Sequence, residues 1–249
     1  MNIDETINKI RKTKPVVLCL TNYVTMDLIA NSLLAIGSAP IMSEHSEDIE
    51  EMVQISNALY INIGTLNDEF TELARCSIKF AKANNKPIIF DPVGSGATQL
   101  RTNIAREIAN HAAIIRGNAS EIMSLVSDQS KTLGAESLNK VDEAKASSKI
   151  LAQQCRNIIA ISGEIDFITD GNNEHYNYYG SPLMQKVTGM GCSLTAVIAA
   201  FRAVNENSYD AALSAIQYFT LCGTMAAKKA AAPGSFRAQF IDELYKNEI

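Results

Sequence analysis

KPIIFDPVGSG, residues 86–96, joins a nearly continuous apolar run to an Asp-Pro turn and a glycine-rich loop. An apolar run without alternation predicts a strand that is covered by helices on both faces, as in a parallel sheet. Ligands of open α/β sheets bind beyond the carboxyl ends of the strands, so Asp91 is a candidate to hold Mg²⁺ or to orient a substrate. An Asp-Pro turn followed by flexible glycines explains the same residues without a site.

Runs of the same kind lie on both sides of this stretch. They are PVVLCL (15–20), SAPIM (38–42), ALYINIG (58–64), AAIIRGN (112–118) and NIIAISG (157–163). Amphipathic segments without Gly or Pro separate several of them, at 24–36, 47–57 and 67–84. This alternation predicts βαβ units, and hence an α/β protein with a mostly parallel sheet.

The C-terminal third follows a different pattern. Residues 164–180 hold two short alternating runs around Asp170-Gly171, which predicts an antiparallel hairpin at a sheet edge. Apolar residues then recur at helical spacing from Leu194 to Val204, and an Ala-rich run at 209–231 predicts a second, closely packed helix. PGSF (233–236) is expected to break that helix before a last charged one. The polar segment 127–142 is the predicted linker.

Composition limits the class of protein. The chain has 249 residues, 47% of them hydrophobic and 20% charged, which suits one globular α/β domain over 1–249. The net charge of −5 disfavours nucleic acid and anionic lipid as partners. No apolar run reaches the ~20 residues of a membrane span, and the charged N-terminus lacks a signal-peptide core, so a cytoplasmic location is expected. Five widely spaced cysteines and three isolated histidines argue against a disulfide framework and a zinc site.

The loop Thr188–Cys192, TGMGC, precedes a predicted amphipathic helix. Glycines that let backbone amides converge at a helix N-terminus favour an anion site, for phosphate or a developing oxyanion. The helix dipole is expected to lower the pKa of the Cys192 thiol, which makes it the candidate reactive cysteine. A glycine-loosened helix start with a buried thiol is the structural alternative. The segment matches neither a Rossmann fingerprint nor a P-loop.

RGNASE, residues 116–121, follows another predicted strand and leads into a helical pattern. Asn118 and Glu121 have the spacing of a capping box, which explains both without any function. An arginine, two acids and a glycine-rich anion site nevertheless all fall at strand ends or helix starts, where one crevice could collect them. Arginine suits phosphate, and the acids suit a hydrated Mg²⁺ bound to phosphates. Phosphoryl transfer from a nucleotide uses all of these parts.

Several spaced blocks together resemble one known family along nearly the whole chain. They are LTNYVTMDLIAN, GSAPIMS, LYINIGTL, IIFDPVGSGAT, IIRGNASEI, AISGE, KVTGMGC and PGSF. The chain resembles hydroxyethylthiazole kinase, of the ribokinase-like superfamily. The resemblance implies a three-layer α/β/α fold with a mostly parallel sheet and an antiparallel edge hairpin. It also implies transfer of the ATP γ-phosphate to the primary hydroxyl of 4-methyl-5-(2-hydroxyethyl)thiazole in thiamine salvage.

The resemblance assigns roles to particular positions of this sequence. The substrate-side positions are Met42, Asn22 and Gly189. The positions that bind ATP phosphates are Arg116 and Ser162, with Gly191 in the anion hole. The acids associated with Mg²⁺ are Asp91 and Glu121. Cys192 stands where many ribokinase-like kinases have an aspartate base, and the thiazole kinases are similar in having cysteine there. The family is typically a homotrimer with sites between subunits.

Three positions depart from the family's commonest pattern, which leaves the acceptor less certain than the reaction. Met190 stands where alanine is usual and could narrow the anion loop, Ser162 stands where threonine is frequent, and Tyr23 stands where a second asparagine often occurs and could reshape the substrate pocket. The alternatives are another activity on the same fold, a hydroxymethylpyrimidine or pyridoxal kinase or an ADP/ATP-dependent dehydratase, and a thiazole-binding protein without turnover. A cysteine hydrolase built on Cys192 lacks a histidine partner.

Overall fold

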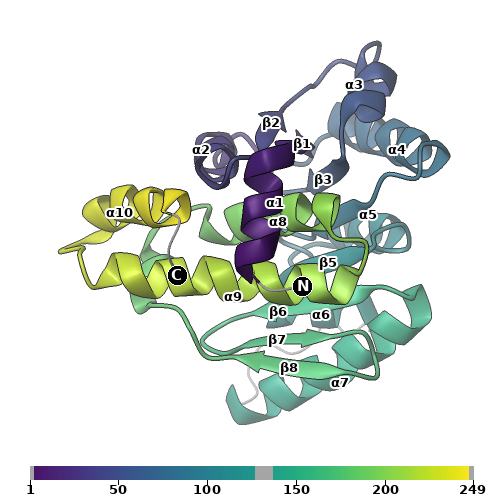
Figure 1. The fold of residues 1–249 in the computed structure, drawn as a ribbon. Coiled ribbons are helices and arrows are strands. Elements are labelled where there is room, and N and C mark those ends of the chain that lie inside the picture. The colour runs from purple at the N-terminus through teal and green to yellow at the C-terminus, as the bar shows by residue number, and fades with distance from the viewer. Residues whose placement is uncertain (1–2, 127–136, 247–249) are drawn as a thin grey trace.

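A computed structural model describes residues 3–126 and 137–246. The described strands form one sheet in the order β2-β1-β3-β4-β5-β6-β7-β8, shown in Figure 1. Six of them are parallel: β1 (Val16–Leu20), β2 (Ala39–Ile41), β3 (Ala58–Asn62), β4 (Ile88–Asp91), β5 (Ile114–Asn118) and β6 (Ile158–Ser162). Each lies within one of the six apolar runs, so the predicted parallel sheet is confirmed.

The edge hairpin is also confirmed. β7 (Asp166–Thr169) pairs antiparallel with β6, and β8 (Glu174–Asn177) pairs antiparallel with β7 at the edge of the sheet. The turn forms at Asp170-Gly171 because Gly171 takes a positive φ of 95° and Asp170 Oδ1 accepts hydrogen bonds from the amides of Asn172 and Asn173.

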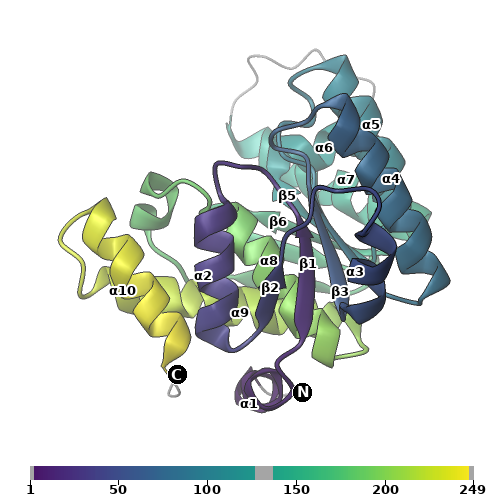
Figure 2. The same ribbon diagram turned by 90° about the horizontal axis from the view of Figure 1, so that it is seen from above.

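Helices cover both faces of the sheet, as Figures 1 and 2 show, which confirms the three-layer architecture. One face carries α1 (Ile3–Thr13), α2 (Met26–Ile36), α8 (Met190–Val204), α9 (Ser208–Ala227) and α10 (Pro233–Tyr245). The other carries α3 (Ile49–Ile55), α4 (Asp68–Ala83), α5 (Gln99–Ala109), α6 (Ala119–Val126) and α7 (Ser137–Cys155). A short 3₁₀ helix, η1 (Pro182–Lys186), precedes α8.

The strands divide their side chains between two apolar cores with the period of two that a pleated strand requires. In β1, Val17 and Cys19 belong to the core under α8, whereas Leu18 and Leu20 belong to the core under α4. In β3, Ala58 and Tyr60 face the α8 side. Because both faces are buried, the strands are apolar throughout instead of alternating with polar residues.

Two boundaries differ from the sequence predictions. α9 ends at Ala227, and PGSF forms the first turn of α10 instead of preceding it, because proline at the first helical position needs no hydrogen bond and has a suitable φ. The predicted linker 127–142 falls partly outside the described residues, at 127–136, and its last residues instead begin α7 at Ser137. Within the described part, no helix has the length and apolar character that a bilayer crossing needs.

Candidate active site

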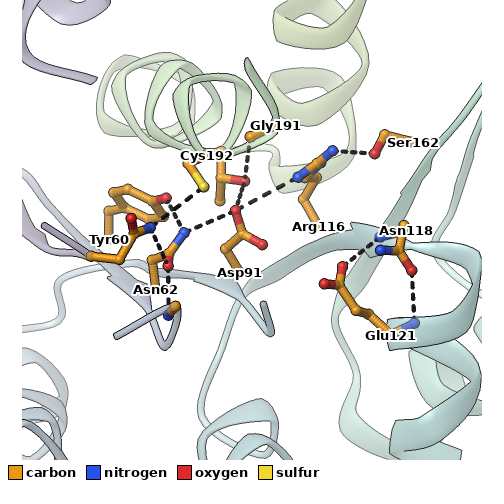
Figure 3. A network of polar contacts seen from close by, with 12 residues as sticks. Tyr60, Asn62, Asp91, Arg116, Asn118, Glu121, Ser162, Gly191 and Cys192 are labelled. Carbon is orange, nitrogen blue, oxygen red and sulfur yellow. Dashed lines mark hydrogen bonds and ion pairs between the residues drawn. The ribbon is translucent and has the colours of Figure 1, made fainter. Parts of the chain in front are cut away.

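The candidate site lies at the carboxyl ends of β3, β4, β5 and β6, under the first turn of α8, as Figure 3 shows. Strand periodicity decides which side chains point there. Two residues before each polar residue stands a core residue of the α8 side: Tyr60, Ile89, Ile114 and Ala160. Because residues two positions apart in a strand share a face, the residues that follow these four also point toward α8: Asn62, Asp91, Arg116 and Ser162.

The first turn of α8 lies against the guanidinium of Arg116. Gly189 is the N-cap residue with a φ of 91°, a conformation that glycine adopts without strain. A Cβ built on Gly191 would lie 2.5 Å from Arg116 Nη1 and 2.7 Å from Nη2, so a larger residue at this position would force the guanidinium to shift. The unpaired amides of a helix N-terminus and a guanidinium thus face one region, where they favour a bound anion.

Arg116 connects two of the other predicted positions. Its Nη2 donates a hydrogen bond to Ser162 Oγ, and its Nη1 lies 3.6 Å from Asp91 Oδ2. The buried Nε has no hydrogen-bond partner among the described residues. The arginine therefore retains hydrogen-bonding capacity, which suits it to a phosphate oxygen.

Asp91 is fully buried, with 0% of its surface exposed. Its Oδ2 accepts hydrogen bonds from Thr195 Oγ1 at 2.9 Å and from Asn62 Nδ2 at 3.2 Å. Burial raises the pKa of Asp91 to about 6, and the nearby Arg116 limits that rise. Asp91 Oδ1 has no partner within the described part of the chain. One carboxylate oxygen is thus unsatisfied in the absence of a ligand.

Glu121 lies in the first turn of α6 and forms the capping box that its spacing predicted. Its backbone amide donates to Asn118 Oδ1 at 2.9 Å, and the Asn118 amide donates to Glu121 Oε2 at 2.8 Å. The Gly94 amide also donates to Glu121 Oε1, at 2.9 Å. The structural interpretation of this pair is therefore confirmed. The same bonds tie the glycine loop after Asp91 to the start of α6, so the two motifs do meet in space.

The donor set can be compared with the needs of a metal ion. Within the described residues, no group of three or more His, Cys, Asp and Glu side chains could hold a metal on its own. Mg²⁺ commonly takes only one or two protein carboxylates and completes its shell with phosphate oxygens and water. The unpartnered Oδ1 of Asp91 and the neighbouring carboxylate of Glu121 fit a Mg²⁺ ion that phosphates hold in the main.

Cys192 lies in the first turn of α8, with its Sγ 3.6 Å from Asn22 Nδ2. The expectation of a lowered thiol pKa is wrong. Burial raises the pKa of Cys192, and the negative charge of Asp91 adds to the rise, so these two effects outweigh the hydrogen bonds and the Arg116 charge that favour the thiolate. The described histidine contacts also lead elsewhere, to Lys82, Gln217 and Glu47. No histidine is positioned as the partner that a cysteine hydrolase needs.

The three substrate-side positions surround the same end of the sheet. Asn22 follows β1 and packs against Gly64, where an added Cβ would lie 2.8 Å from Asn22 Cβ. Met42 follows β2 and packs, like Cys192, against the α8-side core. Gly189 contacts Thr25, which precedes α2.

A small cavity of about 80 Å³ lies beside Asn22 and is lined by residues that include Thr21, Tyr23, Glu44, Thr65 and Phe70. Tyr23 therefore borders this cavity. The Met190 side chain does not narrow the anion loop, because it is buried in the α8-side core.

Three residues of this network are absent from the sequence predictions: Asn62, Tyr60 and Thr195. Asn62 Nδ2 donates to Tyr60 Oη at 2.8 Å and to Asp91 Oδ2, and Thr195 lies one helical turn after Gly191. A signal for Asn62 exists in the sequence, since this asparagine ends the apolar run of β3 as Asp91 ends that of β4, and the two residues are partners in the sheet. Nothing local marks Tyr60 or Thr195, which look like core residues.

The architecture is that of ribokinase-like kinases. A solved ribokinase-like superfamily protein from Enterococcus faecalis has the same fold, with a TM-score of 0.69 and 14% identity over 98% of this chain and 94% of that one. The hydroxyethylthiazole kinase of Pyrococcus horikoshii is closer, with a TM-score of 0.90 and 34% identity over 98% of this chain and 92% of that structure.

Sequence comparison places the chain more narrowly. The model of the hydroxyethylthiazole kinase family matches residues 7–248. The hydroxyethylthiazole kinase of Chlamydia caviae is 47% identical over 243 residues, which cover 97% of this chain and 93% of that protein. The chain belongs to the hydroxyethylthiazole kinase family.

Proposed function

We propose that this protein transfers the γ-phosphate of ATP to the primary hydroxyl of 4-methyl-5-(2-hydroxyethyl)thiazole, as an enzyme of thiamine salvage. The observation that carries the proposal is the position of the Arg116 guanidinium, which lies against Gly191 and also contacts Asp91 and Ser162. A guanidinium beside a helix N-terminus is suited to stabilise the negative charge that spreads over the phosphoryl oxygens during transfer.

In this mechanism, most of the rate enhancement comes from positioning and charge stabilisation, because phosphoryl transfer has a loose transition state. Arg116, Ser162 and the amides around Gly191 bind the ATP phosphates. Asn22, Met42 and Gly189 hold the thiazole alcohol on the other side of the α8 N-terminus. Asp91 and Glu121 would hold a Mg²⁺ ion, which when bound neutralises phosphate charge.

Cys192 has a limited role in proton transfer. Because burial raises its pKa, the sulfur is mainly a thiol at neutral pH, and only its small thiolate fraction takes the proton of the acceptor hydroxyl, late in the transfer. The Asn22 Nδ2 hydrogen that faces Sγ supports any negative charge that develops on the sulfur.

The direct test is ADP formation by the purified protein with MgATP. Hydroxyethylthiazole, hydroxymethylpyrimidine, pyridoxal and no acceptor are compared, each with and without EDTA. We expect ADP only with the thiazole alcohol and only without EDTA. Turnover with a different alcohol would move the function to another ribokinase-like kinase. Binding of the thiazole without ADP would indicate a binding protein.

Replacing Cys192 with alanine is expected to lower kcat by about 10-fold, less than the roughly 100- to 10,000-fold contribution of an obligatory general base. Cys192→Asp is expected to remain active or to improve, because a carboxylate is ionised more fully than a thiol whose pKa is raised. Steady-state kinetics of both variants measure this. Complete loss of turnover in a folded Cys192→Ala protein would require a covalent or obligatory-base role instead.

The assembly is a further part of the proposal. We propose one kinase domain over residues 1–249, located in the cytoplasm and assembled as a homotrimer with sites between subunits, as the family resemblance implies. The apolar side chains of Tyr23 and Val24, 59% and 70% exposed beside Asn22, support a subunit contact near the site. Sedimentation equilibrium measures the mass of the assembly, and a monomer at micromolar concentration would contradict the trimer.

A further inference from the structure

Asn62, at the end of β3, is a buried amide whose hydrogen bonds are all used. It has 0% exposure. Its Oδ1 accepts from the Gly64 amide and from Asn22 Nδ2, each at 2.9 Å. Its Nδ2 donates to Tyr60 Oη at 2.8 Å and to Asp91 Oδ2 at 3.2 Å. An asparagine offers two donor hydrogens and two acceptor lone pairs, so this side chain is saturated.

The surroundings allow Asn62 only one orientation. The backbone amide of Gly64 can only donate, so it requires the oxygen of the Asn62 amide to face it. The carboxylate of Asp91 accepts, so it requires the nitrogen. A flipped Asn62 would place its Nδ2 donor against the Gly64 amide and its Oδ1 acceptor against the carboxylate of Asp91.

This orientation in turn decides how Asn22 is placed. Because Asn62 presents its oxygen, Asn22 must present its nitrogen, and the same Nδ2 then lies 3.6 Å from Cys192 Sγ. All the hydrogen bonds that Asn22 makes with its side chain, within the described part of the chain, use Nδ2. Its Oδ1 is left available as an acceptor.

We propose that Asn62 is a positioning residue that orients the Asn22 amide, so that Asn22 Oδ1 accepts the hydrogen of the acceptor hydroxyl while Nδ2 faces Cys192. An alcohol whose hydrogen is held in this way directs an oxygen lone pair toward the phosphorus atom. The inference rests on the proposed function for the identity of the alcohol. This orientation of Asn22 explains how the hydroxyl is aligned although the sulfur beside it is mainly a protonated thiol.

Gly64 offers a second way to disturb the same contact. A Cβ added at Gly64 would lie 2.8 Å from Asn22 Cβ and 2.9 Å from both Asn22 Cγ and Nδ2. The substitution Gly64→Ala is therefore expected to displace Asn22 in a protein that still has asparagine at position 62. The two substitutions are expected to share one phenotype if they act through Asn22.

The test compares Asn62→Leu, Gly64→Ala and Asn22→Ala with the double variant Asn62→Leu/Asn22→Ala. We expect Asn62→Leu to lower kcat by about 10- to 100-fold, because a displaced positioning group costs that much, with less than about a threefold change in the KM for ATP. The double variant should be no slower than the slower of its two single variants, because Asn62 acts through Asn22. The proposal would be overturned if the fold losses in kcat of the two single variants multiply in the double variant. It would also be overturned if the KM for ATP rises by as large a factor as kcat falls.

A further variant separates positioning from folding. Asn205→Ala is the matched control, since Asn205 is a buried asparagine at the far end of α8 whose Oδ1 accepts from the Asn207 amide. It should lower the melting temperature and leave kcat unchanged, and a drop in its kcat would show that the assay reports general destabilisation.

A crystal structure of Asn62→Leu, or of Gly64→Ala if the first variant does not fold, provides a readout that is independent of activity. We expect the Asn22 amide to be rotated or displaced, and an unchanged Asn22 would overturn the proposal. If the wild-type protein phosphorylates a different alcohol, the proposed substrate fails while the kinetic test of Asn62 proceeds with that alcohol. If it accepts no alcohol, the proposed function fails and the crystal structure alone decides the role of Asn62.

Discussion

Gly191→Ala is expected to lower kcat for ADP formation by at least about 100-fold, the order of effect seen when one preorganised donor is removed from an anion site. The added Cβ would lie 2.5 Å from Arg116 Nη1 and 2.9 Å from Cζ, so the guanidinium must leave its place against α8. It would then lose its contacts with Ser162 and Asp91. Steady-state kinetics at saturating ATP and acceptor measure the loss.

Gly234→Ala is the matched control for this experiment. Gly234 lies in the first turn of α10, and a Cβ added there meets no atom within 4 Å. The same Gly-to-Ala change at a helix start should therefore leave kcat unchanged. A Gly191→Ala enzyme with nearly normal kcat would show that the position of Arg116 does not limit the transfer step.

Asp91→Asn is expected to lower kcat/KM by about 100-fold, because the substitution removes a charged partner of Arg116 and an oxygen suited to Mg²⁺. Its effect on stability should have the opposite sign at neutral pH. The buried carboxylate of the wild-type protein has a pKa of about 6, above its ordinary value of 3.8. The folded state therefore holds the proton more tightly than the unfolded state does.

The sign of the pH dependence follows from that difference. For the wild-type protein, the contribution of Asp91 to the free energy of unfolding is highest below about pH 4 and is lost as the pH rises through 6. The loss is up to about 3 kcal/mol, at roughly 1.4 kcal/mol for each pKa unit. Asparagine does not titrate, so Asp91→Asn should gain stability relative to wild type by about this amount between pH 4 and pH 7.

Urea unfolding of both proteins at several pH values measures the difference, in which the contributions of the other titrating groups cancel. A difference that is independent of pH would show that Asp91 is not held in a disfavoured charged state. Retained activity in Asp91→Asn would remove this carboxylate from the proposed binding of Mg²⁺ and phosphate.

The sequence by itself was sufficient for the strands, the edge hairpin and the end of the sheet that carries the site. Six nearly continuous apolar runs are typical of strands that are covered on both faces, and the hairpin signal at Asp170-Gly171 is local. The capping box of Asn118 and Glu121 is also local, because both partners lie within four residues. The even spacing from core residues to Asp91, Arg116 and Ser162 already places these three side chains on one face of the sheet.

Only the tertiary structure decided how those side chains meet and what surrounds them. Asn62 and Thr195 join the site through Asp91, which lies 29 and 104 residues away from them in the chain, and no local pattern encodes such contacts. The pKa of Cys192 rises because of burial and the charge of Asp91, and burial is a property of the packed fold. Strand and turn signals arise from local backbone preferences, whereas desolvation and hydrogen-bond polarity depend on which segments the fold brings together.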